Sequence, residues 1–148
     1  MADRDEAQVA HWETIRQQVG AHLRQMRLGT SQAKLSGDLE DLGYRVTQSM
    51  ISRYEQGVLD SPLSRERVIG WGLCCASLGS REFRELLGLF GYSIPWTAAH
   101  LDAFDRLLRD YRQLPLPDQI VLRRKLLWHV LGIEATEPAA NESVTRPR

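Results

Sequence analysis

The sequence predicts an all-α protein, and two observations support this fold class. Apolar residues recur three or four positions apart along nearly the whole chain, and no stretch alternates apolar and polar residues long enough for a half-buried strand. Helix caps also fall between the apolar sets: helices can begin after Thr30 or Ser31 and after Thr47, and can end at Gly43 and Gly57. With 43% hydrophobic residues in a chain of 148, the protein can form its own core.

Seven helices are expected, over about residues 6–28, 31–42, 47–57, 62–78, 80–90, 97–113 and 118–131. One face of the first helix carries Val9, Trp12, Ile15, Val19, Leu23 and Met26. Ser61 followed by Pro62 has the order that opens a helix, and this pair is expected to begin the fourth. Pro115 and Pro117 force a tight reversal between the last two helices.

The chain is expected to divide into three parts. Residues 1–92 hold the first five helices, residues 97–132 form a helical hairpin, and residues 134–148 form a tail whose lack of large apolar side chains is typical of disorder. The hairpin has more apolar surface than two helices can bury alone, so it is expected to pack against a second copy of the chain. The expected dimer-interface residues are Leu101, Phe104, Leu108, Tyr111, Leu127, Trp128 and Leu131.

Composition narrows the class of protein. The 19 basic and 19 acidic residues give no net charge, whereas nucleic-acid binders are commonly basic, so a DNA-binding function has to rest on a motif. Cys74 and Cys75 are adjacent and cannot supply spaced zinc ligands, so no metal is expected. No apolar run is long enough to span a membrane and the first residues are acidic, which indicates a cytoplasmic protein. Without a Gly-rich phosphate loop or a nucleophile arrangement, neither an enzyme nor a cofactor is expected.

Three short motifs follow one another along the chain between Leu23 and Gly57. They are Leu23, Arg24 and Arg27, then Ser31-Gln32 with Leu35 and Ser36, then Ile51-Ser52-Arg53-Tyr54-Glu55-Gln56-Gly57. With these residues, about residues 19–78 resemble the XRE/Cro family of transcriptional regulators. The resemblance implies a five-helix, lambda-repressor-like helix-turn-helix domain that binds double-stranded DNA, with the hairpin following it.

The third helix would be the recognition helix. Ile51 and Tyr54 lie one helical step apart and would anchor it on the core. The outward residues expected to read bases are Gln48, Ser49, Ser52 and Arg53. Gln pairs well with adenine and Arg with guanine.

Contacts to the DNA backbone are expected from Arg27, Ser31, Gln32, Arg45, Thr47, Arg65 and Arg67. By the resemblance, Gln32 would also brace Gln48. Glu55 is expected to have a structural role, because it follows Tyr54 near the core side.

The sequence departs from the family pattern between Leu35 and Gln48, where the spacing is about five residues longer than usual. This insertion lengthens the second helix and the turn, and it brings Asp38, Glu40 and Asp41 near the motif. Their charge would weaken phosphate binding unless it points away, and Arg45 in the turn would compensate.

Two functions remain open from the sequence. The first is a transcriptional regulator, most simply a repressor, that binds an inverted-repeat operator as a homodimer. The second is a protein-interaction module with the same fold, such as an antitoxin that binds a toxin or a factor bound to RNA polymerase. The neutral charge and the long first helix favour the second slightly.

Overall fold

The computed structural model describes residues 2–132, with side chains from residue 10 onward. Over this range the chain forms seven helices and no strand, which confirms the all-α prediction. They are α1 (Ala2–Arg27), α2 (Gln32–Asp41), α3 (Gln48–Gln56), α4 (Arg65–Cys74), α5 (Arg81–Phe90), α6 (Ala98–Asp110) and α7 (Leu116–Leu131). None of these helices combines the length and the apolar character needed to cross a membrane. The predicted tail, residues 134–148, lies outside the described residues.

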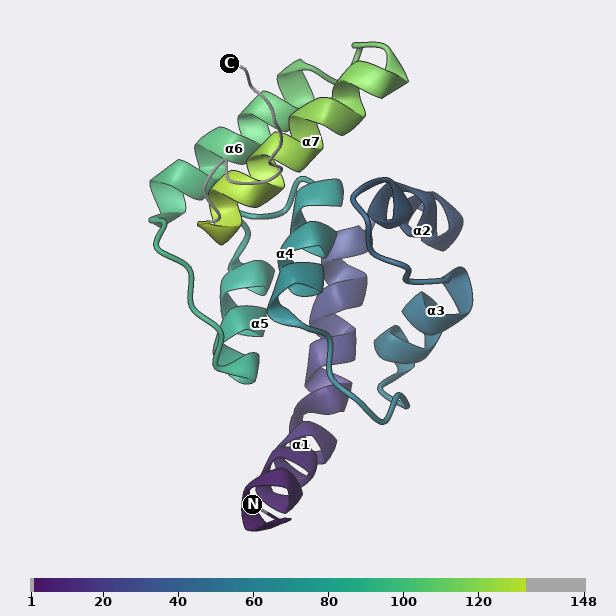
Figure 1. The fold of residues 1–148 in the computed structure, drawn as a ribbon, viewed down its shortest axis with the longest axis vertical. Coiled ribbons are helices and arrows are strands. Elements are labelled where there is room, and N and C mark those ends of the chain that lie inside the picture. Colours follow the sequence, from purple (N-terminus) through teal and green to yellow (C-terminus); the bar gives the residue numbers. More distant parts are fainter. Residues whose placement is uncertain (1, 133–148) are drawn as a thin grey trace, which may run out of the picture.

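Helix α4 occupies the centre of the molecule, with α2, α5 and α7 around it (Figure 1). All residues from Val68 to Leu73 are buried, so this helix has no solvent face in its second half. Two glycines let its neighbours approach. A Cβ atom at Gly72 would lie 3.0 Å from the Phe83 ring on α5, and one at Gly70 would lie 3.4 Å from Leu39 on α2.

The long helix α1 supports α3 and α5 (Figure 1). Its predicted apolar face is confirmed from Trp12 to Met26, all of whose members are buried, whereas Val9 precedes the described side chains. At Gly20 the backbone of α3 lies directly on α1: a Cβ atom there would be 2.5 Å from the carbonyl oxygen of Glu55. The end of α3 is therefore positioned by backbone contact.

The hairpin of α6 and α7 lies across one end of α4 (Figure 1). The inner face of α7 is buried, and on α6 the buried Asp105 accepts hydrogen bonds from the backbone N–H groups of Leu78 (2.9 Å) and Gly79 (2.7 Å). The prediction that the apolar face of the hairpin binds a second copy is wrong for Leu101, Leu127 and Leu131. These three are buried in the core of their own chain, where α7 packs against α4 and α6 packs against α7.

Most helix ends fall where the sequence places them. The side chains of Ser31, Thr47 and Ser80 each accept a hydrogen bond from the backbone N–H three residues later, as N-caps do. The start of the fourth helix was predicted wrongly: α4 begins at Arg65, capped by Ser64. Between the expected start and the real one the chain is not helical, and it buries Leu63 in the core.

Candidate nucleic-acid interface

Helix α3 is fixed at both ends and along its inner face. At its start the Thr47 hydroxyl accepts a hydrogen bond from the N–H of Met50 (3.1 Å). At its end Gly57 adopts a left-handed conformation with φ of 73°, which a side chain would strain. Ile51 and Tyr54 are buried between these points, and burial raises the pKa of the Tyr54 phenol. The orientation of the opposite face is therefore set.

That opposite face carries the residues predicted to read bases. Gln48, Ser49 and Arg53 are exposed, and Ser52 is half-buried. The Ser52 hydroxyl accepts a hydrogen bond from the Gln56 side chain (3.0 Å) and keeps its own proton for another acceptor. An amide, hydroxyls and a guanidinium thus face solvent from one short helix.

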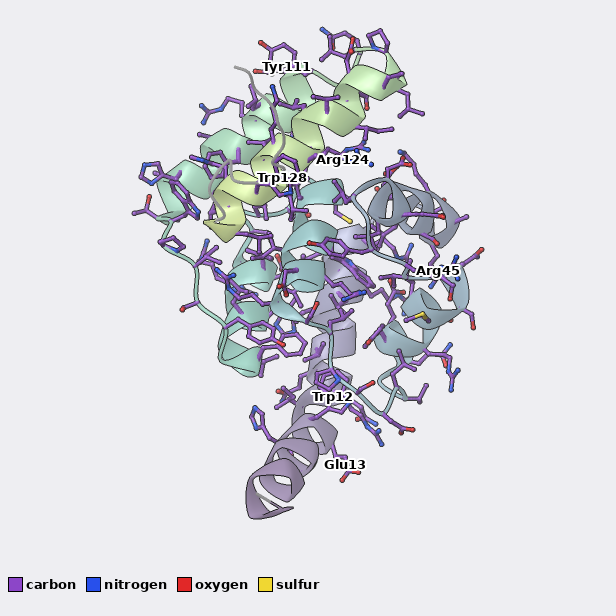
Figure 2. All side chains as sticks on the ribbon, in the orientation of Figure 1. Trp12, Glu13, Arg45, Tyr111, Arg124 and Trp128 are labelled. Carbon is purple, nitrogen blue, oxygen red and sulfur yellow. The ribbon has the colours of Figure 1, made fainter. Side chains whose placement is uncertain are left out.

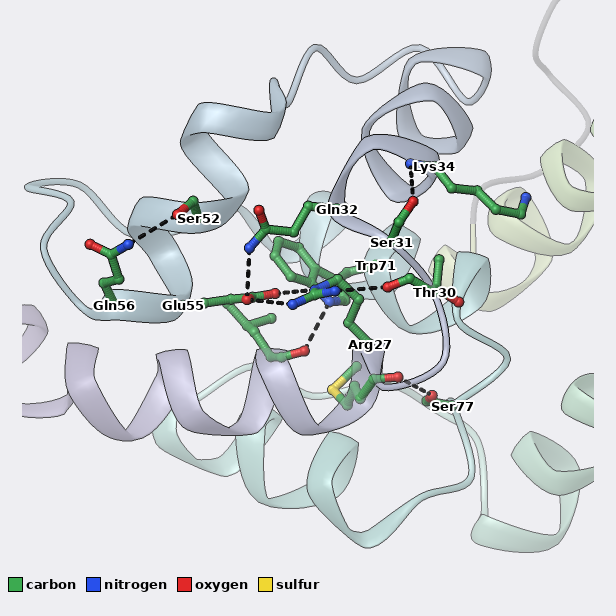
Figure 3. A network of polar contacts seen from close by, with 12 residues as sticks. Arg27, Thr30, Ser31, Gln32, Lys34, Ser52, Glu55, Gln56, Trp71 and Ser77 are labelled. Atoms are coloured by element: carbon green, nitrogen blue, oxygen red, sulfur yellow. Dashed lines mark hydrogen bonds and ion pairs between the residues drawn. The ribbon is translucent and has the colours of Figure 1, made fainter.

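A buried ion pair ties this helix to α1 (Figure 3). Arg27 donates to both carboxylate oxygens of Glu55, at 2.5 and 2.8 Å, and to the carbonyl oxygen of Thr30 at 2.7 Å. Only 15% of the Arg27 side chain and 5% of the Glu55 side chain are exposed. The hydrogen bond to Glu55 raises the pKa of Arg27 above its ordinary value, so the guanidinium stays charged. The structural role expected for Glu55 is confirmed.

The same contacts correct two predicted roles. Arg27 directs three of its five N–H donors at Glu55 and Thr30 inside the chain, so its main role is to hold α3 on α1. The Gln32 amide donates to Glu55 (3.1 Å) instead of bracing Gln48. Sequence spacing identified the positions but could not identify their partners, which lie on other helices.

The other residues predicted to contact the DNA backbone differ in exposure and in the partners that they have within the chain. Arg45 is exposed in the turn before α3. Arg65 donates to the carbonyl oxygen of Ser93 (2.9 Å), and Arg67 lies over the Tyr44 ring at 5.3 Å from its centroid. Ser31 and Thr47 are exposed, but their hydroxyls already cap α2 and α3.

Helix α2 ends at Asp41 and α3 begins at Gln48, so residues 42–47 form the turn between them. The turn is packed: Val46 is buried, and its carbonyl oxygen accepts a hydrogen bond from Ser36 (2.8 Å). That this spacing is longer than in XRE/Cro regulators stays a prediction from the resemblance.

The acidic residues of this region do not all face the motif. Asp38 is buried and pairs with Lys34 (3.0 Å) and with Arg123 on α7 (3.5 Å). The Asp41 carbonyl oxygen accepts a hydrogen bond from Arg124 (2.8 Å). This link between α2 and the hairpin could not be predicted from the sequence, because the charge run Arg123-Arg124-Lys125 resembles an ordinary solvated face.

The two cysteines are protonated thiols outside any metal-binding cluster of the described residues. Burial raises the pKa of both thiols, that of Cys75 to about 12, so they are protonated at neutral pH. Within residues 10–132, no group of three or more His, Cys, Asp and Glu side chains gathers in a way that could hold a metal ion.

Comparisons with protein-family models, with curated proteins and with solved structures find no match for this chain.

Proposed function

We propose that the protein is a sequence-specific regulator that binds double-stranded DNA through α3. The observation that carries this proposal is the outward face of α3, where Gln48, Ser49 and Arg53 are exposed on a helix whose position is fixed from three sides. A capped helix with such side chains suits the major groove, where base edges present distinct donor and acceptor patterns. The resemblance of residues 19–78 to XRE/Cro regulators supports the same role.

The proposed contacts fall into two groups. Gln48 and Arg53 would form paired hydrogen bonds with adenine and guanine, and Ser49 and Ser52 would add single ones. Arg45 would contact the phosphate backbone from the turn, since it is exposed and forms no ion pair among those of residues 10–132. The electrostatic share of binding would be small, because Arg27, Arg65 and Arg67 are engaged within the chain.

Binding to random-sequence duplex DNA over a salt series tests this proposal. Counterion release makes the affinity of a DNA binder fall as salt rises, with a log–log slope of about −0.9 for each phosphate neutralised. The expected slope is shallow, and Arg45→Gln should reduce it by about one. Arg106→Gln, an exposed change on α6, serves as the matched control and should leave it unchanged. Absence of duplex binding at low salt would contradict the proposal. The operator should be sought first in the DNA around the protein's own gene.

Homodimerisation and repression remain predictions within this proposal. A dimer would place two copies of α3 on an inverted repeat about one DNA turn apart. Of the predicted interface, Tyr111 is exposed, while Leu101 and Leu127 are in the core. Sedimentation at micromolar concentration should show a dimer; a strict monomer would remove the inverted-repeat operator from the proposal.

A second candidate is a protein-interaction module, such as an antitoxin or a factor bound to RNA polymerase. It is favoured by the way the chain uses its own cations: three of the arginines predicted to contact phosphate bind other groups within the protein. Salt-insensitive association with such a partner, lost in Arg53→Ala while duplex binding is absent, would favour this candidate over the regulator.

A further inference from the structure

A cavity of about 610 Å³ opens between the hairpin and the rest of the molecule. Its walls come from four places: the link between α1 and α2, the start of α2 at Lys34, the end of α4, and the facing tips of α6 and α7. Small-molecule sites commonly have volumes of about 300 to 1,000 Å³. The cavity therefore has the size of a ligand site, and it lies on the opposite end of α2 from the turn that leads to α3.

All charged residues that line the cavity are basic. Four basic residues line it, namely Lys34, Arg109, Arg112 and Arg123, and no acidic residue does. This is unusual for a chain with equal numbers of acidic and basic residues. Asp38, behind the wall, pairs with Lys34 and Arg123, whereas no ion pair among those of residues 10–132 involves Arg109 or Arg112. The mouth of the cavity thus carries two arginines outside any ion pair, and their positive charge attracts an anion.

The rest of the wall is apolar. Within residues 10–132, five large hydrophobic side chains are exposed, and three of them line this cavity: Leu28 (62% exposed), Tyr111 (44%) and Leu116 (55%). Leu108 and Leu122, half-buried, continue the same surface inward. Figure 2 shows Tyr111 near the tip of the hairpin. Exposed apolar side chains gathered in a concave site mark a binding surface for an apolar group.

Arg123 adds a polar group that is incompletely satisfied. Its Nη1 atom is buried and has no hydrogen-bond partner, although it lies 3.5 Å from an Asp38 carboxylate oxygen. A buried donor without a partner is costly, and a charged one more so. Arg123 also lines the cavity, so its guanidinium adds positive charge to that wall although Asp38 offsets part of it.

We infer that this cavity binds a small amphipathic carboxylate, with its apolar body against Leu108, Leu122 and Tyr111 and its carboxylate among Arg109, Arg112 and Arg123. The cavity has both features that such a molecule requires, a cationic rim and an apolar wall, and their arrangement does not depend on whether α3 binds DNA. The inference thus goes beyond the proposed function and stands or falls separately from it.

Calorimetric titration of the full chain with decanoate tests the inference, with 1-decanol as a neutral compound of matching chain. Decanoate should bind at one site per chain. 1-Decanol should bind about tenfold or more weakly than decanoate, because it lacks the charge-assisted hydrogen bond. The double variant Arg109→Gln/Arg112→Gln should lower the affinity for decanoate by a similar factor. Both side chains are exposed, so their replacement should not disturb folding.

The control variant is Arg106→Gln. Arg106 lies on α6, as Arg109 does, but does not line the cavity. This variant should bind decanoate as the unmodified protein does. No decanoate binding, equal binding of 1-decanol, or an equal loss in the Arg106 variant would each overturn the inference. DNA binding is not part of the readout, so a failure here leaves the proposed function untouched.

Discussion

At the scale of single residues, Glu55 shows how one side chain can hold a functional element in place. It lies within the family-like string of α3, yet its carboxylate faces inward and accepts hydrogen bonds from Arg27 and Gln32. Three helices, α1, α2 and α3, are thereby joined at one carboxylate. Its importance is for stability, and the reading of DNA would fall to its neighbours.

Replacing Glu55 with Ala should destabilise the protein strongly. The substitution leaves Arg27 charged, largely buried and without its main partner, and breaking a buried ion pair in this way costs about 3 to 5 kcal/mol. Urea unfolding followed by circular dichroism measures the loss. Glu85→Ala is the matched control, because Glu85 is half exposed and solvent screens its ion pairs at the surface, so its loss should be much smaller. Equal losses in the two variants would show that the buried pair contributes nothing special.

Arg53 and Arg45 should behave differently in DNA binding. Arg53 lies on the outward face of α3, so Arg53→Ala should cost about 1 to 3 kcal/mol at one base position. Arg45 lies in the preceding turn, so Arg45→Gln should weaken all sequences alike. Titrations against operator variants separate the two patterns. A uniform loss for the Arg53 variant would mean that a different face of α3 meets the bases.

At the scale of elements, the packing of α1 against α3 depends on a missing side chain. Gly20 has no conformational need for glycine, but the α3 backbone occupies the place where a side chain would be. The contact joins the supporting helix to the end of the proposed recognition helix.

Gly20→Ala should therefore destabilise the protein by about 1 to 3 kcal/mol. The new methyl group would clash with backbone atoms of α3, which cannot move away by changing a rotamer. Gly37→Ala on α2 is the control, since nothing lies within 4 Å of its added Cβ. That change should stabilise the helix by about 0.5 to 1 kcal/mol. Thermal unfolding of both variants gives the comparison, and a stable Gly20 variant would show that α1 and α3 can separate at little cost.

The attachment of α6 predicts a dependence of stability on pH. Burial raises the pKa of Asp105, against the opposing effect of its hydrogen bonds from Gly79 and Leu78; Arg109 lowers it and Asp102 raises it further. The folded protein thus holds this proton more tightly than the unfolded chain. The contribution of Asp105 to the free energy of unfolding should fall as pH rises from the ordinary carboxyl pKa to the raised one.

Urea unfolding across the acidic range, for the unmodified protein and for Asp105→Asn, isolates this contribution. The difference in unfolding free energy between the two should decrease with rising pH in that window. A difference that increases with pH instead would mean that the two backbone hydrogen bonds outweigh burial. The variant's overall stability does not affect this test, because the readout is a slope.

At the scale of the whole molecule, local features were predictable and long-range pairings were not. The caps at Ser31, Thr47 and Ser80 and the inner face of α1 follow from residue type and helical spacing, which act within a few residues. The partners of Arg27 and Asp38 lie on other helices, so only the assembled fold brings them together.

The hairpin illustrates the same limit for apolar surfaces. Its sequence shows that one face must be covered, but burial against another copy and burial against α4 leave the same apolar pattern in the sequence. The structure resolves this for Leu101, Leu127 and Leu131, which lie in the core. It also shows what the pattern could not, namely a cavity whose walls come from segments far apart in the chain.

The link from Arg123 to Asp38 has a thermodynamic consequence. Arg123 lines the cavity and also pairs with a carboxylate on α2, the helix that precedes the proposed recognition helix. An anion that drew Arg123 away from Asp38 would loosen α2 from α7 and so bias how α3 is presented. Coupling between two sites is reciprocal: by whatever factor such an anion changed the affinity for DNA, bound DNA would change the affinity for the anion.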